Sequence, residues 1–333
     1  MKHLSSALLL LAFSASAAAQ TEVRLAVHKS FSLPKETIAK FEQQHKVKVS
    51  LITAGSGNEM LNKLILSKAK PIADAVYGLD NANIGKAKQS GILAERQPAS
   101  KATIFSMPHA VAVNYAYVSI NYDKKWFADK NLPLPQSMQD LTRPEYRNLL
   151  VVPNPNTSSP GLSFLMANIG GLGEEAAFQW WTKMRQNGVK VSKSWSDAYY
   201  TDFSQNGGAY PMVVGYATSP AAEVHYSKGK YSEPPTGNLF FKGAVYRQVE
   251  GAAVLKGAKQ PELAAKLVSW LQSPEVQTTL ATEMWVYPTV KGTALPPAYR
   301  YANRPNQADS PSREAIDGKQ RQWLGRWTRI VLK

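Results

Sequence analysis

The sequence predicts an α/β protein of two lobes, each a mixed, mostly parallel sheet flanked by helices. Short apolar strands alternate with helical segments along most of the 333 residues, in the pattern of βαβ units. This length suits two domains of ordinary size rather than one. No low-complexity linker separates the two halves, so the long apolar segments at 112–122 and 246–255 are expected to cross between the lobes.

The first half contains three expected strands, each followed by a helix. The strands are expected at 23–27, 47–52 and 73–77. A helix begins near Pro34, and another follows the turn at 55–57, where apolar residues from Met60 to Ile65 fall at helical spacing. The third helix is expected to end at Gly91, a residue suited to a C-terminal cap.

The second half repeats this alternation. Strands are expected at 149–152, 189–191, 212–216 and 245–255, and helices around 176–184, 260–271, 274–281 and 322–332. Counting the two crossings as boundaries, residues 20–116 form the first part of lobe 1 and residues 117–247 form lobe 2. Residues 248–333 return to lobe 1 and add the C-terminal helices.

Residues 1–19 have the features of a cleaved secretory signal peptide. A short basic start precedes a nearly unbroken apolar run from Leu4 to Ala12, and small residues lead to Ala17-Ala18-Ala19. The apolar run is shorter than the roughly 20 residues that a membrane-spanning helix needs. The sequence therefore predicts a protein exported to the periplasm.

Composition excludes several kinds of chemistry. The chain has no cysteine, so a thiolate nucleophile, a cysteine-ligated zinc and an iron–sulfur cluster are all impossible. Its 39 Lys and Arg against 24 Asp and Glu give a net charge of +15, but these basic residues are scattered and form no run of five or six. Because the basic residues are scattered, we do not expect nucleic-acid binding. We also expect no cofactor, and we expect a monomer.

Known catalytic motifs are missing as well. The sequence has no G-x-S-x-G elbow, no H-E-x-x-H pair, no dinucleotide fingerprint and no Walker A loop. The segment Gly55-Ser56-Gly57 is better interpreted as a turn. We therefore expect a binding protein and not an enzyme.

Three turns between a strand and a helix are suited to holding a small solute. Ser56-Gly57, Ser158-Ser159-Pro160 and Ser219-Pro220 each place a hydroxyl at a helix start, where free backbone N–H groups favour anions. Ligands of open α/β sheets bind at the carboxyl ends of the strands, which two facing lobes bring to one cleft. Helix capping alone explains any single one of these turns, and Ser273-Pro274 caps a helix where no ligand is expected.

Several segments, in one order along nearly all of the mature chain, resemble the thiamine-binding periplasmic proteins of bacterial ABC importers. The similar segments are ADAVYGLDN (73–81), TSSPGL (157–162), KSWSDAY (193–199), YATSPA (216–221), KQPELA (259–264) and WVYP (285–288). The resemblance implies a receptor of the Venus-flytrap type, the periplasmic-binding-protein fold of type 2. It would close around thiamine or its phosphates and deliver them to a permease in the inner membrane.

Thiamine joins a flat aminopyrimidine to a cationic thiazolium, which calls for aromatic faces and a carboxylate. We expect Trp195, Tyr216 and Trp285 to supply the aromatic faces, and Asp80 to supply the carboxylate. Core packing is the alternative role for each aromatic residue, and capping of the next helix is the alternative for Asp80. A phosphate would lie against a cradle of hydroxyls and helix starts, formed by Ser56, Gly57, Ser158, Ser159 and Ser219.

The chain departs from the family pattern near the expected ligand. His28 and Lys29 replace an aromatic residue and an acid after the first strand, Ser56 replaces a second acid, and Ala222 replaces a tyrosine. Lys29 and the hydroxyl-rich turns also fit an anionic solute such as a phosphonate, an organophosphate or a carboxylate.

A related subfamily of the same fold binds ferric iron through a histidine, a glutamate and a tyrosine pair. His28, Glu59 and Tyr199-Tyr200 leave that interpretation open. However, Tyr199-Tyr200 falls on an expected helix, whereas the iron family's pair stands where Tyr216-Ala217 lies here.

Overall fold

One continuous sheet runs through both halves of the protein. The computed structural model describes residues 20–333, so the expected signal peptide lies outside the described residues. The strands are β1 (Glu22–Val27), β2 (Lys48–Thr53), β3 (Ala75–Asp80), β4 (Val111–Asp123), β5 (Leu150–Pro153), β6 (Lys190–Ser192), β7 (Met212–Tyr216), β8 (Thr236–Leu239), β9 (Tyr246–Val254) and β10 (Tyr287–Pro288). Their order is β2-β1-β3-β9-β4-β7-β5-β6, with β8 and β10 also paired to β4.

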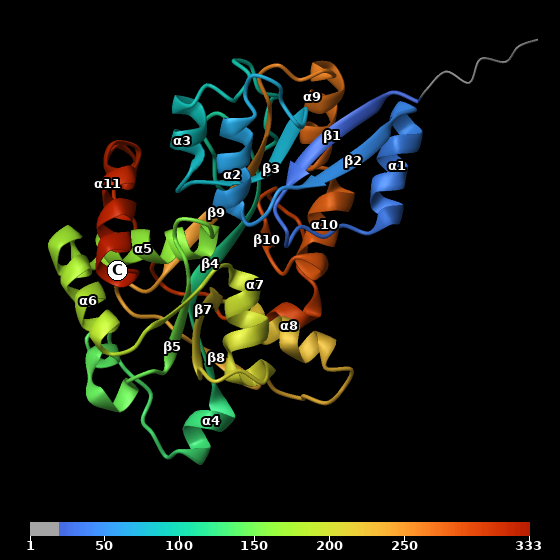
Figure 1. Ribbon diagram of the computed structural model, residues 1–333. Coiled ribbons are helices and arrows are strands. Elements are labelled where there is room, and N and C mark those ends of the chain that lie inside the picture. Colours follow the sequence, from blue (N-terminus) through green and yellow to red (C-terminus); the bar gives the residue numbers. More distant parts are fainter. Residues whose placement is uncertain (1–19) are drawn as a thin grey trace, which may run out of the picture.

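Helices cover this sheet and group into two lobes (Figure 1). They are α1 (Lys35–His45), α2 (Gly57–Leu66), α3 (Ile84–Gln89), α4 (Lys124–Asp129), α5 (Ser159–Leu172), α6 (Glu174–Gln186), α7 (Trp195–Asp197), α8 (Ser219–Tyr226), α9 (Pro261–Trp270), α10 (Pro274–Glu283) and α11 (Arg313–Val331). Lobe 1 contains β1–β3 with α1–α3, α9 and α10, and lobe 2 contains β5–β8 with α4–α8. No helix in the described part of the chain is long and apolar enough to cross a membrane.

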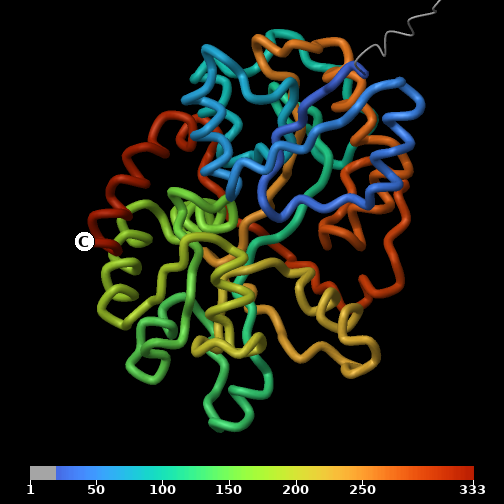
Figure 2. The backbone as a smooth tube through the Cα atoms, turned by 45° about the vertical axis from the view of Figure 1, so that its right-hand side comes forward, coloured from blue at the N-terminus to red at the C-terminus, as the bar shows by residue number. Residues whose placement is uncertain are grey.

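The strands β4 and β9 join the two lobes. They pair antiparallel from Val111↔Ala252 to Val118↔Tyr246, and β4 then continues into lobe 2 against β7. Figure 2 shows β4 as the green segment that passes from one lobe into the other. Within each lobe the outer pairs β1–β2, β1–β3, β5–β6 and β5–β7 are parallel. These two strands occupy the segments where crossings were expected, and the expected boundaries at 117 and 247 fall inside them.

The strand β3 continues past its expected end at 77. All six residues of β3 are buried, and its pairing with β9 shifts register between Tyr77 and Leu79. Gly78 makes this bulge possible, because its φ of +98° lies in the left-handed region that favours glycine. A Cβ at Gly78 would also lie 2.4 Å from Cδ2 of His28, so the bulge leaves room for that ring.

The C-terminal helix α11 is longer than expected and packs on lobe 2. Ser312 caps its start by accepting a hydrogen bond from the backbone N–H of Ala315 (3.2 Å). The buried face of α11 carries Trp323 and Trp327, and Trp327 packs edge-on against Trp181 of α6 at 5.6 Å between ring centroids. The sequence placed residues 248–333 with lobe 1, whereas α11 belongs to the hydrophobic core of lobe 2.

Candidate functional site

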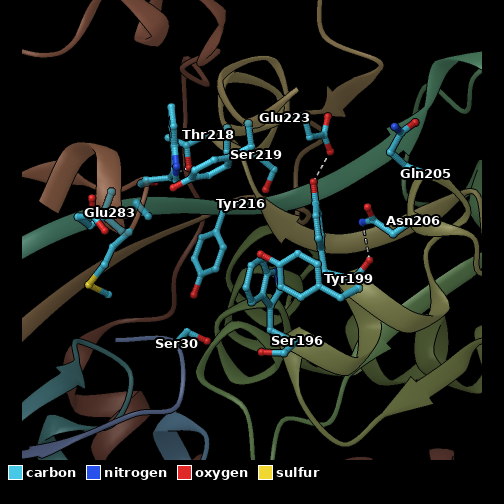
Figure 3. Close-up of a pocket in the computed structure, with 18 of the residues that line it drawn as sticks. Ser30, Ser196, Tyr199, Gln205, Asn206, Tyr216, Thr218, Ser219, Glu223 and Glu283 are labelled. Carbon is cyan, nitrogen blue, oxygen red and sulfur yellow. Dashed lines mark hydrogen bonds between the residues drawn. The ribbon is translucent and has the colours of Figure 1, made fainter. Parts of the chain in front are cut away.

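A cleft of about 610 Å³ opens between the lobes (Figure 3). Lobe 1 contributes the loop after β1 and the residues that follow α10, while lobe 2 contributes the segment 195–206 and the turn from β7 into α8. Six of the expected site residues line it: His28, Lys29, Trp195, Tyr216, Ser219 and Trp285. The strand ends that the sequence singled out therefore do converge.

Aromatic side chains form much of the cleft wall. Trp195 stacks on Tyr199 with ring centroids 5.2 Å apart and an angle of 28°, and it meets Tyr216 at 5.4 Å and 63°. The indole Nε1 of Trp195 is buried and has no hydrogen-bond partner among the described residues. A flat ligand ring fits such a wall, because aromatic faces gain dispersion energy from stacking and attract cations.

Trp285 reaches the cleft from the loop after α10 in an unusual backbone conformation. Its φ of 54° lies in the left-handed region, which bulky residues rarely adopt and which costs of the order of 1–3 kcal/mol. Two contacts hold Trp285 there. The Thr218 hydroxyl donates to the Trp285 carbonyl oxygen at 2.6 Å, and the Tyr299 ring stacks on the Trp285 ring with centroids 5.7 Å apart. A strained residue fixed in this way at a cleft wall is typical of a functional position.

A small recess of about 40 Å³ adjoins the cleft, and four more expected residues line it: Ser56, Gly57, Ser158 and Ser159. The N-termini of α2 and α5 meet here, since the N–H of Glu59 donates to the carbonyl of Thr157 at 3.2 Å. Ser56 is the N-cap of α2 and forms a capping box with Glu59. The Oγ of Ser159 is buried without a partner among the described residues, so a hydroxyl and helix N-termini converge on the recess.

The expected turn at Ser219 differs in detail. Thr218 is the N-cap of α8, so Ser219 is the first helical residue and Pro220 the second. Ser219 lines the cleft and not the recess. The phosphate cradle drawn from the sequence is therefore divided between two neighbouring spaces.

Lys29 crosses from lobe 1 to lobe 2 beside the recess. Its Nζ donates to Oγ of Ser194 and lies 3.7 Å from Oδ1 of Asp197. Both partners belong to the turn that begins α7, where Ser194 also caps the helix by accepting from the N–H of Asp197. Lys29 thus brings positive charge to this end of the cleft and contacts both lobes.

Two cleft carboxyl groups were not found from the sequence. Glu250, in β9, accepts a hydrogen bond from the Tyr77 hydroxyl at 3.3 Å and lies 3.7 Å from Nε2 of His28. Burial raises the pKa of Glu250 to about 7 and lowers the pKa of His28 to about 4. His28 is therefore neutral at pH 7 and gives Glu250 no compensating charge.

The second carboxyl group belongs to Glu223, in α8. It accepts hydrogen bonds from the hydroxyls of Tyr199 and Thr236, and burial raises its pKa to about 7. A signal for each glutamate was present in the sequence. Glu250 interrupts an apolar strand, and Glu223 follows Ser219 by one helical turn, which places both on the same face.

Asp80 does not line the cleft or the recess. It is fully buried, and its carboxylate accepts from the backbone N–H groups of Ala82 (2.9 Å) and Asn83 (3.0 Å) and from Nε2 of Gln248 (3.1 Å). Burial raises its pKa to about 6. These contacts give Asp80 the role of fixing the turn before α3, the alternative that the sequence left open.

The residues considered for iron are not gathered around one point. His28, Tyr199 and Tyr200 line the cleft, but Glu59 does not. The Tyr199 hydroxyl is engaged with Glu223. Within residues 20–333, no group of three or more His, Cys, Asp or Glu is placed to hold a metal ion.

Comparison with known proteins finds one matching family and sequence relatives that share one name. The family described as bacterial extracellular solute-binding protein matches residues 70–310. The thiamine-binding periplasmic protein of Escherichia coli (strain K12) is 30% identical over 297 residues, which cover 87% of this chain and 86% of that protein. The protein of the same name from Salmonella typhimurium (strain LT2) is 29% identical over 97% of both chains.

Solved structures agree with these sequence relatives. A structure titled periplasmic thiamin binding protein has a TM-score of 0.82 and 26% identity, covering 94% of this chain and 96% of that one. Iron-bound HitA from Pseudomonas aeruginosa has a TM-score of 0.72 over 93% of this chain, but at 20% identity it shows the shared fold alone.

Proposed function

Because this chain belongs to the family of bacterial extracellular solute-binding proteins, we propose that it captures thiamine or a thiamine phosphate in the periplasm. It then delivers the ligand to the permease of an ABC importer in the inner membrane. Export follows from the expected signal peptide at 1–19, and the receptor acts as a monomer that releases its ligand unchanged. The names of its sequence relatives support thiamine as the ligand.

One observation carries the proposal of a cationic, flat ligand. The aromatic residues Trp195, Tyr199 and Tyr216 line the same cleft as two carboxyl groups, those of Glu223 and Glu250. Within residues 20–333, neither carboxyl group forms a salt bridge with a lysine or arginine. A bound cation would supply the missing charge, and thiamine brings one on an aromatic ring.

The recess supports a phosphorylated form of the ligand. Its lining combines the N-termini of α2 and α5 with the buried Oγ of Ser159 and with Lys29, and the Glu250 carboxyl group lines it as well. Anions are stabilised where free N–H groups and a cation converge. A phosphate ester of thiamine would place its charged end here and its rings along the aromatic wall.

Isothermal titration calorimetry on refolded, ligand-free protein tests this function. The series is thiamine, its monophosphate, its diphosphate, aminoethylphosphonate and ferric citrate. We expect thiamine or one of its esters to bind most tightly, and mass spectrometry of the protein as purified to show the same ligand carried over. If no thiamine compound binds while one of the other two does, the proposal is wrong.

Lys29 and the recess also favour a second candidate, an anionic solute such as a phosphonate. Such a ligand needs the recess but not the aromatic wall. The same titration separates the two candidates, because aminoethylphosphonate would then bind and unphosphorylated thiamine would not.

A further inference from the structure

The two ends of the cleft differ in the charged groups that line them. Ser30 and Ser196 line both the cleft and the recess, so they mark the end that offers Lys29 and the helix N-termini. Figure 3 shows Glu223 at the far side of Tyr199 and Tyr216 from these two serines. One end therefore offers Lys29 and helix N-termini together with the Glu250 carboxyl group, which lines both spaces, while the other end offers the Glu223 carboxyl group.

Glu223 is oriented by its neighbours and keeps accepting capacity. The hydroxyls of Tyr199 and Thr236 each donate to one of its two oxygens. An ionised carboxylate has about four acceptor positions, so two are left for a ligand. Both neighbours act as donors here, which stabilises the ionised form and fixes the carboxylate at the cleft wall.

An aromatic ring of the cleft wall is hydrogen-bonded to the Glu223 carboxylate. Tyr199, whose hydroxyl donates to Glu223, is the ring that stacks on Trp195. A flat ligand held against this wall thus has the carboxylate near its edge. No lysine or arginine forms a salt bridge with Glu223 in the described part of the chain, and Lys230, which also lines the cleft, lies over the Tyr231 ring at 5.0 Å.

We propose that Glu223 determines specificity by accepting a hydrogen bond from an amino group on the edge of the ligand's aromatic ring. The inference rests on the proposed function, in which this group is the amino substituent of the aminopyrimidine. An ionised carboxylate only accepts hydrogen bonds, so it selects a ring that presents N–H and rejects one that presents a carbonyl oxygen there. The ligand then lies with its anionic end in the recess and its amino group at Glu223.

The test compares thiamine with oxythiamine, in which a carbonyl replaces the amino group, by calorimetry on the ligand-free protein at pH 8. We expect the wild type to bind thiamine tenfold or more tightly than oxythiamine, a typical difference for a hydrogen bond to a charged group. In Glu223→Gln the side-chain amide both donates and accepts, so the preference should fall to about threefold or less. Glu233→Gln removes the same charge from an exposed position outside the cleft and should keep the wild-type preference.

Each outcome decides a different question. If the wild type binds both compounds equally, or if Glu223→Gln keeps the full preference, the inference is overturned and the proposed function stands. If the wild type binds neither compound nor the phosphate esters, the proposed function falls and takes the inference with it. Because the wild-type ratio alone can overturn the inference, the test holds even if Glu223→Gln fails to fold.

Discussion

Replacing Gly57 by alanine tests whether the lobes must meet at the recess for a ligand to bind. Gly57 is the first residue of α2, in lobe 1, and Ser159 is the first residue of α5, in lobe 2. A Cβ on Gly57 would lie 2.1 Å from Oγ and 3.1 Å from Cβ of Ser159. Gly57 does not have a left-handed φ, so alanine suits the helix itself, and the cost arises only where the lobes touch.

The expected loss of affinity follows from these distances. The Oγ of Ser159 can relieve its part of the clash by rotating about χ1, although the Ser159 hydroxyl also stabilises the Asp80 carboxylate. The contact between the two Cβ atoms remains, and 3.1 Å is well inside the ordinary carbon–carbon separation of about 3.5–4.0 Å. Overpacking of this kind costs roughly 1–3 kcal/mol, of which about 1.4 kcal/mol already reduces affinity tenfold. We expect a loss of about tenfold.

A double-mutant cycle measures this contact directly. Thiamine monophosphate is titrated into the wild type, Gly57→Ala, Ser159→Gly and the double variant, and each ligand-free protein is melted as a control. Ser159→Gly removes both clashing atoms, so Gly57→Ala should cost little in that background. The melting temperature of ligand-free Gly57→Ala should not fall, because parted lobes avoid the clash and alanine suits the helix. An equal affinity loss in both backgrounds, or a lowered melting temperature, would refute the reasoning.

Three further predictions concern the cleft. Lys29→Ala should weaken a thiamine phosphate about tenfold and leave free thiamine nearly unchanged, whereas Trp195→Ala should weaken both, as measured by calorimetry. Thiamine affinity should fall as pH decreases from 8 to 5.5, because protonation near pH 7 removes the charge of Glu223 and Glu250. Since pH 5.5 lies about 1.5 units below each pKa, each carboxyl group can reduce the affinity by at most about thirtyfold. A pH-independent affinity would exclude both as cation partners. Saturating ligand should reduce the radius of gyration in small-angle scattering as the lobes hinge about β4 and β9, and an unchanged radius would contradict closure.

The fold was predictable because its main features depend on local patterns. Alternating apolar strands and helices indicated an α/β protein, and two long segments rich in apolar residues indicated β4 and β9 as the strands that cross between the lobes. The placement of α11 was not predictable in the same way. Its spacing of Trp323 and Trp327 predicts a buried helical face, but the partner of that face, α6, is more than a hundred residues away in sequence. Long-range packing of this kind leaves no local signal.

The site was predictable where residues lie at the ends of strands. Ten of the eleven expected residues line the cleft or the recess. All of these except Trp285 lie at the end of a parallel strand or in the turn after it, and such turns meet at one edge of a sheet. Asp80 also ends a strand, but its carboxylate is bound by the backbone N–H groups of the next turn and by Gln248, and a sequence cannot show which way a side chain points. Glu223 and Glu250 were missed because each lies inside a regular element, α8 or β9, and not in a turn after a strand.

Net charge is a poor guide to the ligand of this protein. The chain carries +15, and its sequence replaces two acids of the family pattern by Lys29 and Ser56, which together favour an anionic solute. Charges on the exposed surface act weakly inside a cleft, because salt screens them over about 10 Å, whereas a buried group interacts through a medium of low polarity. At the recess end, Lys29 is partly balanced by Asp197 at 3.7 Å. Glu223 and Glu250 form no salt bridge with a lysine or arginine among the described residues, and Glu250 lines the recess as well as the cleft. When these carboxyl groups are ionised, a basic protein therefore offers its ligand negative charge close to Lys29 and the helix N-termini. A ligand carrying both signs of charge fits this lining better than a simple anion.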